Sequence, residues 1–456
     1  MWHDRAGTAA GEAAFLRASE ASFRGYQSAA PLVAGDANRY AIGMTGKDRV
    51  SVHLNARIRK TFLPFSRPCL AEDEIREVTA TLRSGWITTG PKVAEFEQAF
   101  CHAVGAPAAL ALNSGTAALH LGLIVSGVGQ GDAVITTPLT FCSTMHVIEH
   151  VGARPILVDV EADTLNIDPK RVEAAIAQEG GRGRVRAILP VHLYGHPCDM
   201  DAILTLAERH DLSVVEDAAH ALPSRYKGRL IGSAPNPQSA IRNPRLTCFS
   251  FYATKNLTTG EGGMVTGDPA LIDEARIWSL HGMSRDAWRR YASEGSWYCE
   301  VVQAGFKYNM SDIQAAIGLQ QLRRLGEMQE RRRKVFEGYD RAFAEIPSIE
   351  RPVQRPGVSH AYHLYVIRLN LEMLTIDRAQ FIEELRARNI GTGVHFIPNH
   401  LHPYYRDRYG FLAEDFPVAY REYKRLISLP VYPAMTDDDV QDVVEAVRDV
   451  ASKYRR

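Results

Sequence analysis

Short apolar runs alternate with amphipathic segments from Arg83 through the middle of the chain. Seven runs read as strands, at 108–112, 132–137, 155–160, 185–194, 212–218, 247–253 and 262–268. Apolar residues at helical spacing occupy most of the intervals. Near-continuous apolar strands that alternate with helices are typical of a mostly parallel sheet covered on both faces, so we predict an α/β fold. The interval between the last two strands is too short for a crossover helix, so we expect that pair to be antiparallel.

The C-terminal third follows a different pattern, in which a long helix leads into a smaller α+β unit. Helical spacing of apolar residues predicts this helix at about 311–343, and a proline-rich stretch follows at 346–357. Beyond it we predict a strand at 363–370, a helix at 377–389, a strand at 393–398 and a closing helix from residue 436.

These patterns divide the chain into three expected parts. Residues 1–60 are rich in Ala, Gly, Ser and Arg without sustained apolar periodicity, so we expect a poorly ordered extension with one short helix at 12–24. A large domain with the seven-stranded, mostly parallel sheet is expected at 61–325. A small α+β domain is expected at 326–456.

Composition excludes several classes of protein. The chain is 45% hydrophobic and 23% charged, as soluble globular proteins are. Its 53 Lys and Arg residues balance 53 Asp and Glu residues, which argues against nucleic-acid binding as the main task. Six scattered cysteines without a CxxC pair fit neither a disulfide framework nor a zinc site, so we expect no metal and a reducing cytoplasm. No apolar run approaches the roughly 20 residues that span a bilayer, so no membrane association is expected.

One segment suggests an anion site. The sequence has no GxxxxGK[ST] motif and no GxGxxG after a strand, which disfavours P-loop and Rossmann cofactor binding. In NSGTAALHL, however, Ser114, Gly115 and Thr116 open a helix directly after the first strand, and free N–H groups at a helix start attract anions. An ordinary helix cap is the alternative, and this motif alone favours the cap.

Carboxylates follow another strand, in VVEDAAHA. Glu216 and Asp217 lie where a buried strand ends, and His220 comes one helical turn later. Ligands of such sheets bind at the carboxyl ends of strands. A carboxylate there could cap a helix, bind a metal or hold a protonated heterocycle, and the motif alone does not choose.

The third element is a lysine in CFSFYATKNLTTGEGGMV. Lysines are usually solvated surface charges, but Lys255 comes just after a hydrophobic strand, five residues beyond Ser250. Partial burial there would lower its pKa toward that of a free-amine nucleophile. A phosphate-binding helix start, a carboxylate and a lysine at strand ends are what a pyridoxal phosphate site needs: lysine forms the Schiff base, Asp keeps the pyridine nitrogen protonated, and N–H and hydroxyl donors hold the phosphate.

Six segments together resemble a known family. SGWITTGPKVAEFE, NSGTAALHL, VVEDAAHA, SFYATKNLTTGEGG, FKYNMSDIQAAIGLQQL and TGVHFIP are similar, in order, to motifs of the DegT/DnrJ/StrS-type nucleotide-sugar aminotransferases. These are pyridoxal phosphate enzymes of fold type I that aminate keto sugars. The resemblance extends from about Phe62 to the C-terminus.

The resemblance implies roles for individual residues. Lys255 matches the lysine bound to the cofactor, Asp217 the partner of the pyridine nitrogen, and His220 a residue beside the ring. Phe141 matches the aromatic ring stacked on the cofactor, with core packing as its alternative. The matches to phosphate contacts are Gly115, Thr116 and Ser250 of the same chain and Asn309 from the second subunit of a homodimer. The matches to sugar- or nucleotide-facing positions are Trp86, Thr88 and Thr89, together with His363 and His395, for which core packing is again the alternative.

The implied reaction takes the amino group of L-glutamate, releases 2-oxoglutarate and aminates a 4-keto sugar, with Lys255 moving the proton in each half. Within the family, FLPFSRP, SGWITTGPK and GTGVHF look most like the bacterial UDP-4-keto-pentose enzyme that makes UDP-4-amino-4-deoxy-L-arabinose for lipid A modification and polymyxin resistance. A UDP- or dTDP-4-keto-6-deoxyhexose for surface polysaccharide is the alternative substrate.

The sequence departs from the family pattern in two places, and two alternative functions stay open. The connector 233–246 looks longer than usual for the family, and the N-terminal extension is unusual, so either could alter substrate access. Dehydrating relatives carry histidine at the lysine position, so Lys255 favours transamination over dehydration. A protein that binds a nucleotide sugar without turning it over is the non-enzymatic alternative.

Overall fold

The computed structural model describes residues 59–179, 184–234, 243–283 and 300–456. All of them belong to one compact unit, 54–456. The expected N-terminal extension, 1–60, and its short helix fall outside the described residues except for the last two positions, and so does the middle of the connector, 235–242.

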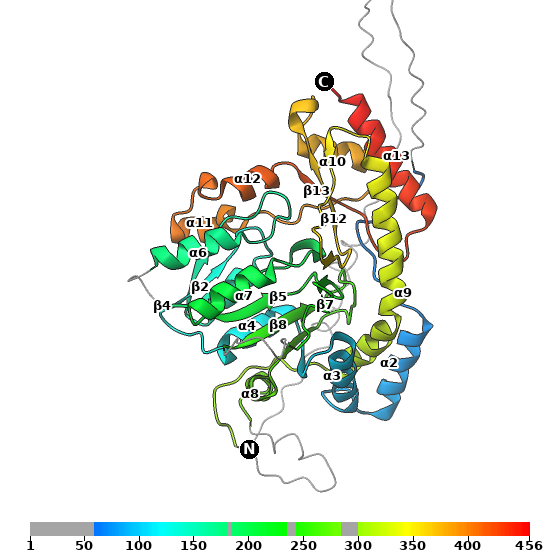
Figure 1. Cartoon of the computed structure of the whole chain (residues 1–456). Coiled ribbons are helices and arrows are strands. Elements are labelled where there is room, and N and C mark those ends of the chain that lie inside the picture. Colours follow the sequence, from blue (N-terminus) through cyan, green and yellow to red (C-terminus); the bar gives the residue numbers. More distant parts are fainter. Residues whose placement is uncertain (1–58, 180–183, 235–242, 284–299) are drawn as a thin grey trace, which may run out of the picture. The chain divides into compact units, whose positions relative to one another are not determined.

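Seven strands form one sheet in the order β1-β9-β8-β5-β4-β2-β3 (Figure 1). Their bounds are β1 Ala108–Leu112, β2 Asp132–Thr136, β3 Arg154–Leu157, β4 Arg184–Ile188, β5 Ser213–Asp217, β8 Arg245–Ser250 and β9 Gly263–Gly267. Strands β3, β2, β4, β5 and β8 are parallel, and β9 is antiparallel to both of its neighbours. The predicted α/β class, the seven strands and the antiparallel last pair are confirmed. The position of β9 between β1 and β8 was not predicted.

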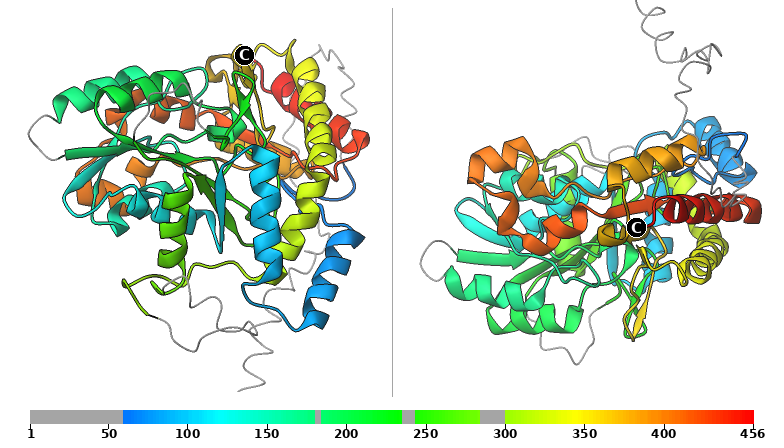
Figure 2. Two further views of the ribbon diagram at one scale, coloured as in Figure 1. Left: turned by 60° about the horizontal axis from the view of Figure 1, so that its bottom comes forward. Right: turned by 90° about the horizontal axis from the view of Figure 1, so that it is seen from above.

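Helices cover both faces of this sheet. Along β1, Leu110 and Leu112 pack in the core shared with α4, α5 and α8, whereas Ala109 and Ala111 pack on the opposite side with α3 and the start of α9. Helices α6 and α7 lie side by side on one face (Figures 1 and 2) and bury their apolar residues against β4 and β5. The helix bounds are α2 Glu72–Ser84, α3 Pro91–Val104, α4 Gly115–Val125, α5 Ser143–His150, α6 Pro169–Gln178, α7 Met200–Arg209, α8 Pro269–Ser279 and α9 Asp312–Phe343.

The long helix α9 begins at a capping box. The N–H of Ser311 donates to Gln314 Oε1 at 3.0 Å, and the Ser311 hydroxyl oxygen accepts from the N–H of Gln314. The first part of α9 packs on α2 and α3, and its last part packs on α13 (Figure 1). The expected domain boundary at 325/326 therefore falls inside one continuous helix.

The smaller domain has a three-stranded antiparallel sheet, β10-β12-β13, packed against α10, α13 and the end of α9. Its elements are β10 Ile349–Glu350, β12 Tyr365–Leu369, α10 Arg378–Ala387, α11 Pro403–Tyr409, α12 Pro417–Tyr423, β13 Leu426–Leu429 and α13 Asp437–Lys453. A second small sheet joins β6 Arg225–Tyr226, β7 Arg229–Leu230 and β11 Val358–Ser359.

One predicted strand of this domain is wrong. Segment 393–398 forms no strand, and within the described part of the chain its backbone pairs through a single bridge, between Gly393 and Ser428 of β13. The apolar pattern misled us because His395 and Phe396 line a cavity instead of a sheet face. The strand that completes the sheet is the fully buried run at β13.

Two glycines of α9 allow a matched test of its packing. An added Cβ at Gly318 would lie 2.7 Å from the fully buried ring of Phe96, whereas nothing lies within 4 Å of one at Gly326. We expect Gly318→Ala to lower the free energy of unfolding by about 1 kcal/mol or more, because overpacking outweighs the gain in helix propensity. Gly326→Ala should raise it by about 0.5–1 kcal/mol. Urea unfolding checks both, and equal shifts in the two variants would contradict the described packing.

Candidate active site

A cavity of about 570 Å³ opens where the strands of the large sheet end and the smaller domain covers them. It gathers most of the residues singled out in the sequence. Those that line it are Gly115, Thr116, Phe141, Asp217, His220, Ser250, Lys255, His363 and His395.

The first wall of the cavity is the start of α4. The Ser114 hydroxyl oxygen accepts from the N–H of Ala117 at 3.0 Å, which caps the helix. A Cβ at position 115 would lie 2.8 Å from the Ser250 Cβ, so Gly115 is what lets the helix start approach the end of β8. The first N–H groups of a helix have no partner within it, and here they lie beside the Ser250 hydroxyl. This corner suits a phosphate group.

Asp217 ends β5 and is 4% exposed. Its Oδ1 accepts from the N–H of Ala219 at 3.1 Å, and its Oδ2 accepts from the Thr144 hydroxyl at 2.9 Å. Thr144 has only one hydroxyl proton, so it accepts from the Thr140 hydroxyl 2.9 Å away. Burial raises the pKa of Asp217, while these donors and the charge of Lys255 act to lower it.

The adjacent carboxylate has a different environment. Glu216 is fully buried and does not line the cavity. Its oxygens lie 2.9 Å from His192 Nε2 and 2.7 Å from Arg245 Nε. Burial alone would raise the pKa of Glu216, but the charge of Arg245 and the contact with His192 lower it to about 2. Of the two adjacent carboxylates, only Asp217 therefore faces the cavity.

Lys255 lies in the same cavity, five residues after the end of β8. Removal from water lowers its pKa to about 8, and the negative charge of Asp217 opposes that fall. Within the described part of the chain, its Nζ makes no hydrogen bond. A larger fraction of this amine than of an ordinary lysine is therefore unprotonated and nucleophilic near neutral pH.

Three histidines, His220, His363 and His395, form another wall of the cavity. The rings of His220 and His363 have centroids 4.5 Å apart, and His395 Nδ1 lies 2.8 Å from the Ser428 hydroxyl oxygen. Burial lowers the pKa of each, and the positive charge of Lys255 lowers them further, to about 4 for His395. All three are neutral at physiological pH, so this wall is polar but uncharged.

Aromatic side chains frame the mouth of the cavity. Phe141 is 55% exposed and lies 5.9 Å from Phe396 between ring centroids, so it is not a core residue. Phe65 stacks on His395 at 5.0 Å. Sequence reasoning missed the place of Phe65 in the site, and also those of Thr144 and Phe396. Only the FLPFSRP motif could have pointed to Phe65, and nothing in the sequence shows that Thr144 bonds to Asp217.

Four predicted residues lie outside this cavity and form a second cluster, beside the start of α9. Asn309 Nδ2 donates to Thr89 Oγ1 at 2.6 Å, and Trp86 Nε1 donates to the Thr89 carbonyl at 3.2 Å. The N–H of Asp312 donates to the Thr88 carbonyl at 3.0 Å. Trp86 is 43% exposed, and Asn309 Oδ1 has no hydrogen-bond partner among the described residues. The structure thus does not bring these four residues to the cavity of their own chain.

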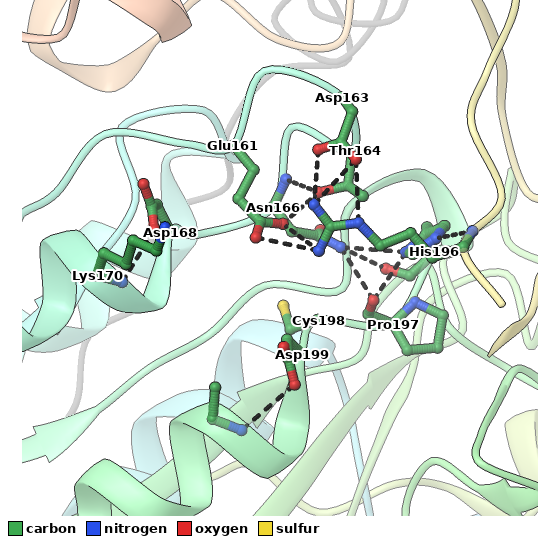
Figure 3. Close-up of polar contacts among 12 residues, drawn as sticks. Glu161, Asp163, Thr164, Asn166, Asp168, Lys170, His196, Pro197, Cys198 and Asp199 are labelled. Carbon is green, nitrogen blue, oxygen red and sulfur yellow. Dashed lines mark hydrogen bonds and ion pairs between the residues drawn. The ribbon is translucent and has the colours of Figure 1, made fainter. Parts of the chain in front are cut away.

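Another depression, of about 620 Å³, lies over the starts of α6 and α7. Polar contacts join the loops beside it (Figure 3). Asn166 Nδ2 donates to the carbonyls of His196 and Pro197 at 3.0 and 3.1 Å. Arg355 forms ion pairs with Asp163 at 2.7 Å and with Glu161 at 3.0 Å. These contacts hold loops together, so we assign this depression a structural role.

Comparisons with known proteins agree with this geometry. The DegT/DnrJ/EryC1/StrS aminotransferase family matches residues 68–448. SpsC of Bacillus subtilis, a spore coat polysaccharide biosynthesis protein, is 52% identical over 394 residues, which cover 86% of this chain and 98% of SpsC. MJ1066 of Methanocaldococcus jannaschii is 50% identical over 399 residues, 87% of this chain and 100% of that protein.

Solved structures agree as well. Spr1654 of Streptococcus pneumoniae, assigned as a sugar aminotransferase and solved in its pyridoxal phosphate (PLP) form, superposes with a TM-score of 0.77 at 36% identity, over 86% of this chain and 99% of Spr1654. In the part of the present chain that the structure describes, no helix is long and apolar enough to cross a membrane. The chain therefore belongs to the DegT/DnrJ/EryC1/StrS aminotransferase family and has the fold of type I aminotransferases that use pyridoxal phosphate.

Proposed function

We propose that this protein transfers the amino group of L-glutamate to the 4-keto carbon of a nucleotide-linked sugar, in the cytoplasm. One observation carries the proposal: Lys255, whose pKa is about 8, shares a cavity with the buried carboxylate of Asp217 and the start of α4. A nucleophilic amine, an acceptor for a protonated ring nitrogen and a phosphate corner are what pyridoxal phosphate chemistry requires.

The residues of the cavity fit this cofactor. The start of α4 at Gly115 and Thr116, with the Ser250 hydroxyl, supplies donors for the phosphate. Asp217 is held by Thr144 and the N–H of Ala219 and would accept a hydrogen bond from the ring nitrogen of the cofactor. Phe141 and His220 line the space that a flat ring would occupy.

Each residue then has a defined part in the reaction. Pyridoxal phosphate, when bound, carries the amino group between the two substrates and accepts the electrons of the bond that breaks at the substrate carbon. The ionised Asp217 keeps the proton on the pyridine nitrogen. Lys255 takes the proton from the α-carbon of glutamate, and in the second half returns a proton to the sugar carbon. The neutral histidine wall limits the number of positive charges near Lys255.

The sugar belongs to surface polysaccharide synthesis in this proposal, as a UDP- or dTDP-4-keto-6-deoxyhexose. The similarity to SpsC, named for spore coat polysaccharide biosynthesis, supports it. The UDP-4-keto-pentose of lipid A modification has only the three short segments FLPFSRP, SGWITTGPK and GTGVHF in its favour. We therefore propose the UDP-4-keto-pentose only as the second candidate substrate.

We further propose a homodimer in which the cluster of Trp86, Thr88, Thr89 and Asn309 completes the partner's site. This cluster lies outside the cavity of its own chain, and Asn309 Oδ1 lacks a partner there. Exposed apolar residues lie beside it on α2 and the following loop, among them Ile75, Leu82 and Ile87.

Asp217→Asn tests the pairing with Lys255. Without the negative charge the pKa of Lys255 should fall below its value of about 8, because Asp217 raises it. The rate at which an amine-reactive reagent modifies the Lys255 peptide, followed against pH by mass spectrometry in cofactor-free protein, measures that pKa, with Lys255→Ala as the blank. Turnover should fall by more than about hundredfold. Near-normal activity would refute the role of Asp217.

Hybrid dimers test the shared site. Asn309→Ala and Lys255→Ala chains, each weakly active alone, should regain part of the activity when mixed, because one site of each hybrid dimer holds both wild-type residues. Differently tagged chains and tandem purification isolate the hybrid. Pure hybrids without any recovery would contradict a site built from two chains.

The substrate class is tested by a glutamate-dependent assay against UDP- and dTDP-linked 4-keto sugars, both pentoses and 6-deoxyhexoses. We expect kcat/KM to be highest for a 6-deoxyhexose, with 2-oxoglutarate released in equal amount. Preference for the pentose would reverse our ranking, and a protein that binds these sugars without releasing 2-oxoglutarate would be the non-enzymatic alternative.

A further inference from the structure

The residue directly after Lys255 links three parts of the site. Asn256 is 6% exposed, and its Nδ2 donates to the Leu222 carbonyl at 2.9 Å and to the Ala361 carbonyl at 2.6 Å. Leu222 follows the Asp217 loop, and Ala361 leads into β12 of the smaller domain. Asn256 therefore holds the loop of Lys255 against the segment after Asp217 and against the smaller domain.

These two bonds fix the orientation of the Asn256 amide. The reverse orientation would place its oxygen against two carbonyl oxygens, which cannot donate. Oδ1 therefore faces Nδ1 of His363, 3.0 Å away, as an acceptor. An acceptor there requires the proton of neutral His363 to be on Nδ1, so the lone pair is on Nε2.

The neighbouring imidazole has the opposite tautomer. His220 Nδ1 accepts from the N–H of Tyr194 at 3.2 Å, so its proton is on Nε2. In the described part of the chain, the Nε2 atoms of His220 and His363 make no hydrogen bond. They are not among the fully buried atoms that lack a partner, and both residues line the cavity, so both Nε2 atoms are accessible from it. The wall thus offers one acceptor and one donor to a ligand.

We propose that Asn256 is a positioning residue that fixes His363 as the Nδ1–H tautomer, so that Nε2 of His363 accepts a hydrogen bond from a hydroxyl group of the sugar substrate. The sugar part rests on the proposed function. L-Glutamate has no hydroxyl group, so a hydroxyl contact at this acceptor is made by the sugar substrate alone. A sugar that lacks this hydroxyl would leave a buried acceptor unpaired.

The charges around His363 are consistent with this neutral state. Lys255, His220 and His395 face its ring, and Arg332 Nη1 donates to its backbone carbonyl at 3.4 Å. Burial and these positive or basic neighbours lower the pKa of His363 well below its ordinary value. No carboxylate contacts the ring among the described residues, so the tautomer depends on Asn256.

The tautomer can be measured without turnover. Cofactor-free protein labelled with ¹⁵N-histidine gives long-range ¹H–¹⁵N patterns that distinguish the two neutral tautomers, and His363→Gln identifies the signals of His363. We expect the Nδ1–H pattern in the wild type, its loss in Asn256→Ala, and a higher His363 titration midpoint in Asn256→Asp, where a carboxylate faces Nδ1. Asn399→Ala is the matched control, because Asn399 Nδ2 also donates to a backbone carbonyl, that of Thr140 at 2.9 Å, without contacting a histidine of the cavity.

A wild-type proton on Nε2, or an unchanged pattern in both Asn256 variants, would overturn the proposal whatever the protein catalyses. The control variant should leave the His363 pattern unchanged; if it alters the pattern as Asn256→Ala does, a general loosening of the fold explains the effect and the proposal fails. The NMR measurement needs neither cofactor nor substrate. Its result for the His363 tautomer would therefore stand even if the proposed function were wrong.

Single-turnover kinetics then test the acceptor. In Asn256→Ala both half-reactions should slow, because the lysine loop loses two hydrogen bonds, but kcat/KM for the keto sugar should fall about ten- to hundredfold more than the rate of the glutamate half-reaction, as expected for one further lost hydrogen bond to a buried acceptor. His363→Asn should give the same split, since its amide still reaches Asn256 but leaves the Nε2 position empty. Equal losses in both halves would show that Asn256 acts only through Lys255, which would overturn the substrate contact.

Discussion

The enclosure of Lys255 and Asp217 in one cavity is the constraint on which the rest of the site depends. Removal from water lowers the pKa of the amine to about 8 and raises that of the carboxyl, and the charge of each opposes the shift of the other. Every neighbour must therefore favour an ionised Asp217 without adding positive charge near Lys255. The structure meets both demands with neutral groups. The donors to Asp217 are a hydroxyl and a backbone N–H, and the wall near Lys255 consists of neutral imidazoles.

The topology of the sheet brings these groups to one edge. Strands β5 and β8 are parallel neighbours, with Asp217 opposite Cys248, so Asp217 and the loop that carries Lys255 emerge together. Strand β9 pairs with both β8 and β1, which sets the start of α4 next to the end of β8. The approach is close enough that a Cβ at Gly263 would lie 2.3 Å from the Ser114 carbonyl oxygen. The proposed phosphate site at the start of α4 thus depends on an antiparallel strand inserted into a parallel sheet.

Local sequence patterns predicted the strands, Lys255 and the helix start, because each depends on a few consecutive residues. The contacts between them were beyond the sequence. Glu216 and Asp217 are adjacent and chemically alike, and only the alternation of side chains along β5, with Arg245 on one side and Thr144 on the other, separates their roles. The roles of Asn256 and Phe65 depend on partners more than 100 and 300 residues away along the chain, respectively. Segment 393–398 resembles a strand because the apolar residues that line a cavity and those that line a sheet are the same types.

The charge of the cavity gives a physical reason for the proposed second subunit. Among the described residues that line it, Lys255 is the sole lysine or arginine, and Asp217 and Glu261 are acidic. The proposed substrates are anions, because glutamate has two carboxylates and a nucleotide sugar has a diphosphate. Moving such anions out of water without cations to pair them is costly. Lys255 cannot supply this pairing, because its amine must be unprotonated to act. The balancing positive charge must therefore come from groups beyond this lining. In the proposed homodimer such a group is available beside the shared cluster, because Lys307 is exposed and lies two residues before Asn309.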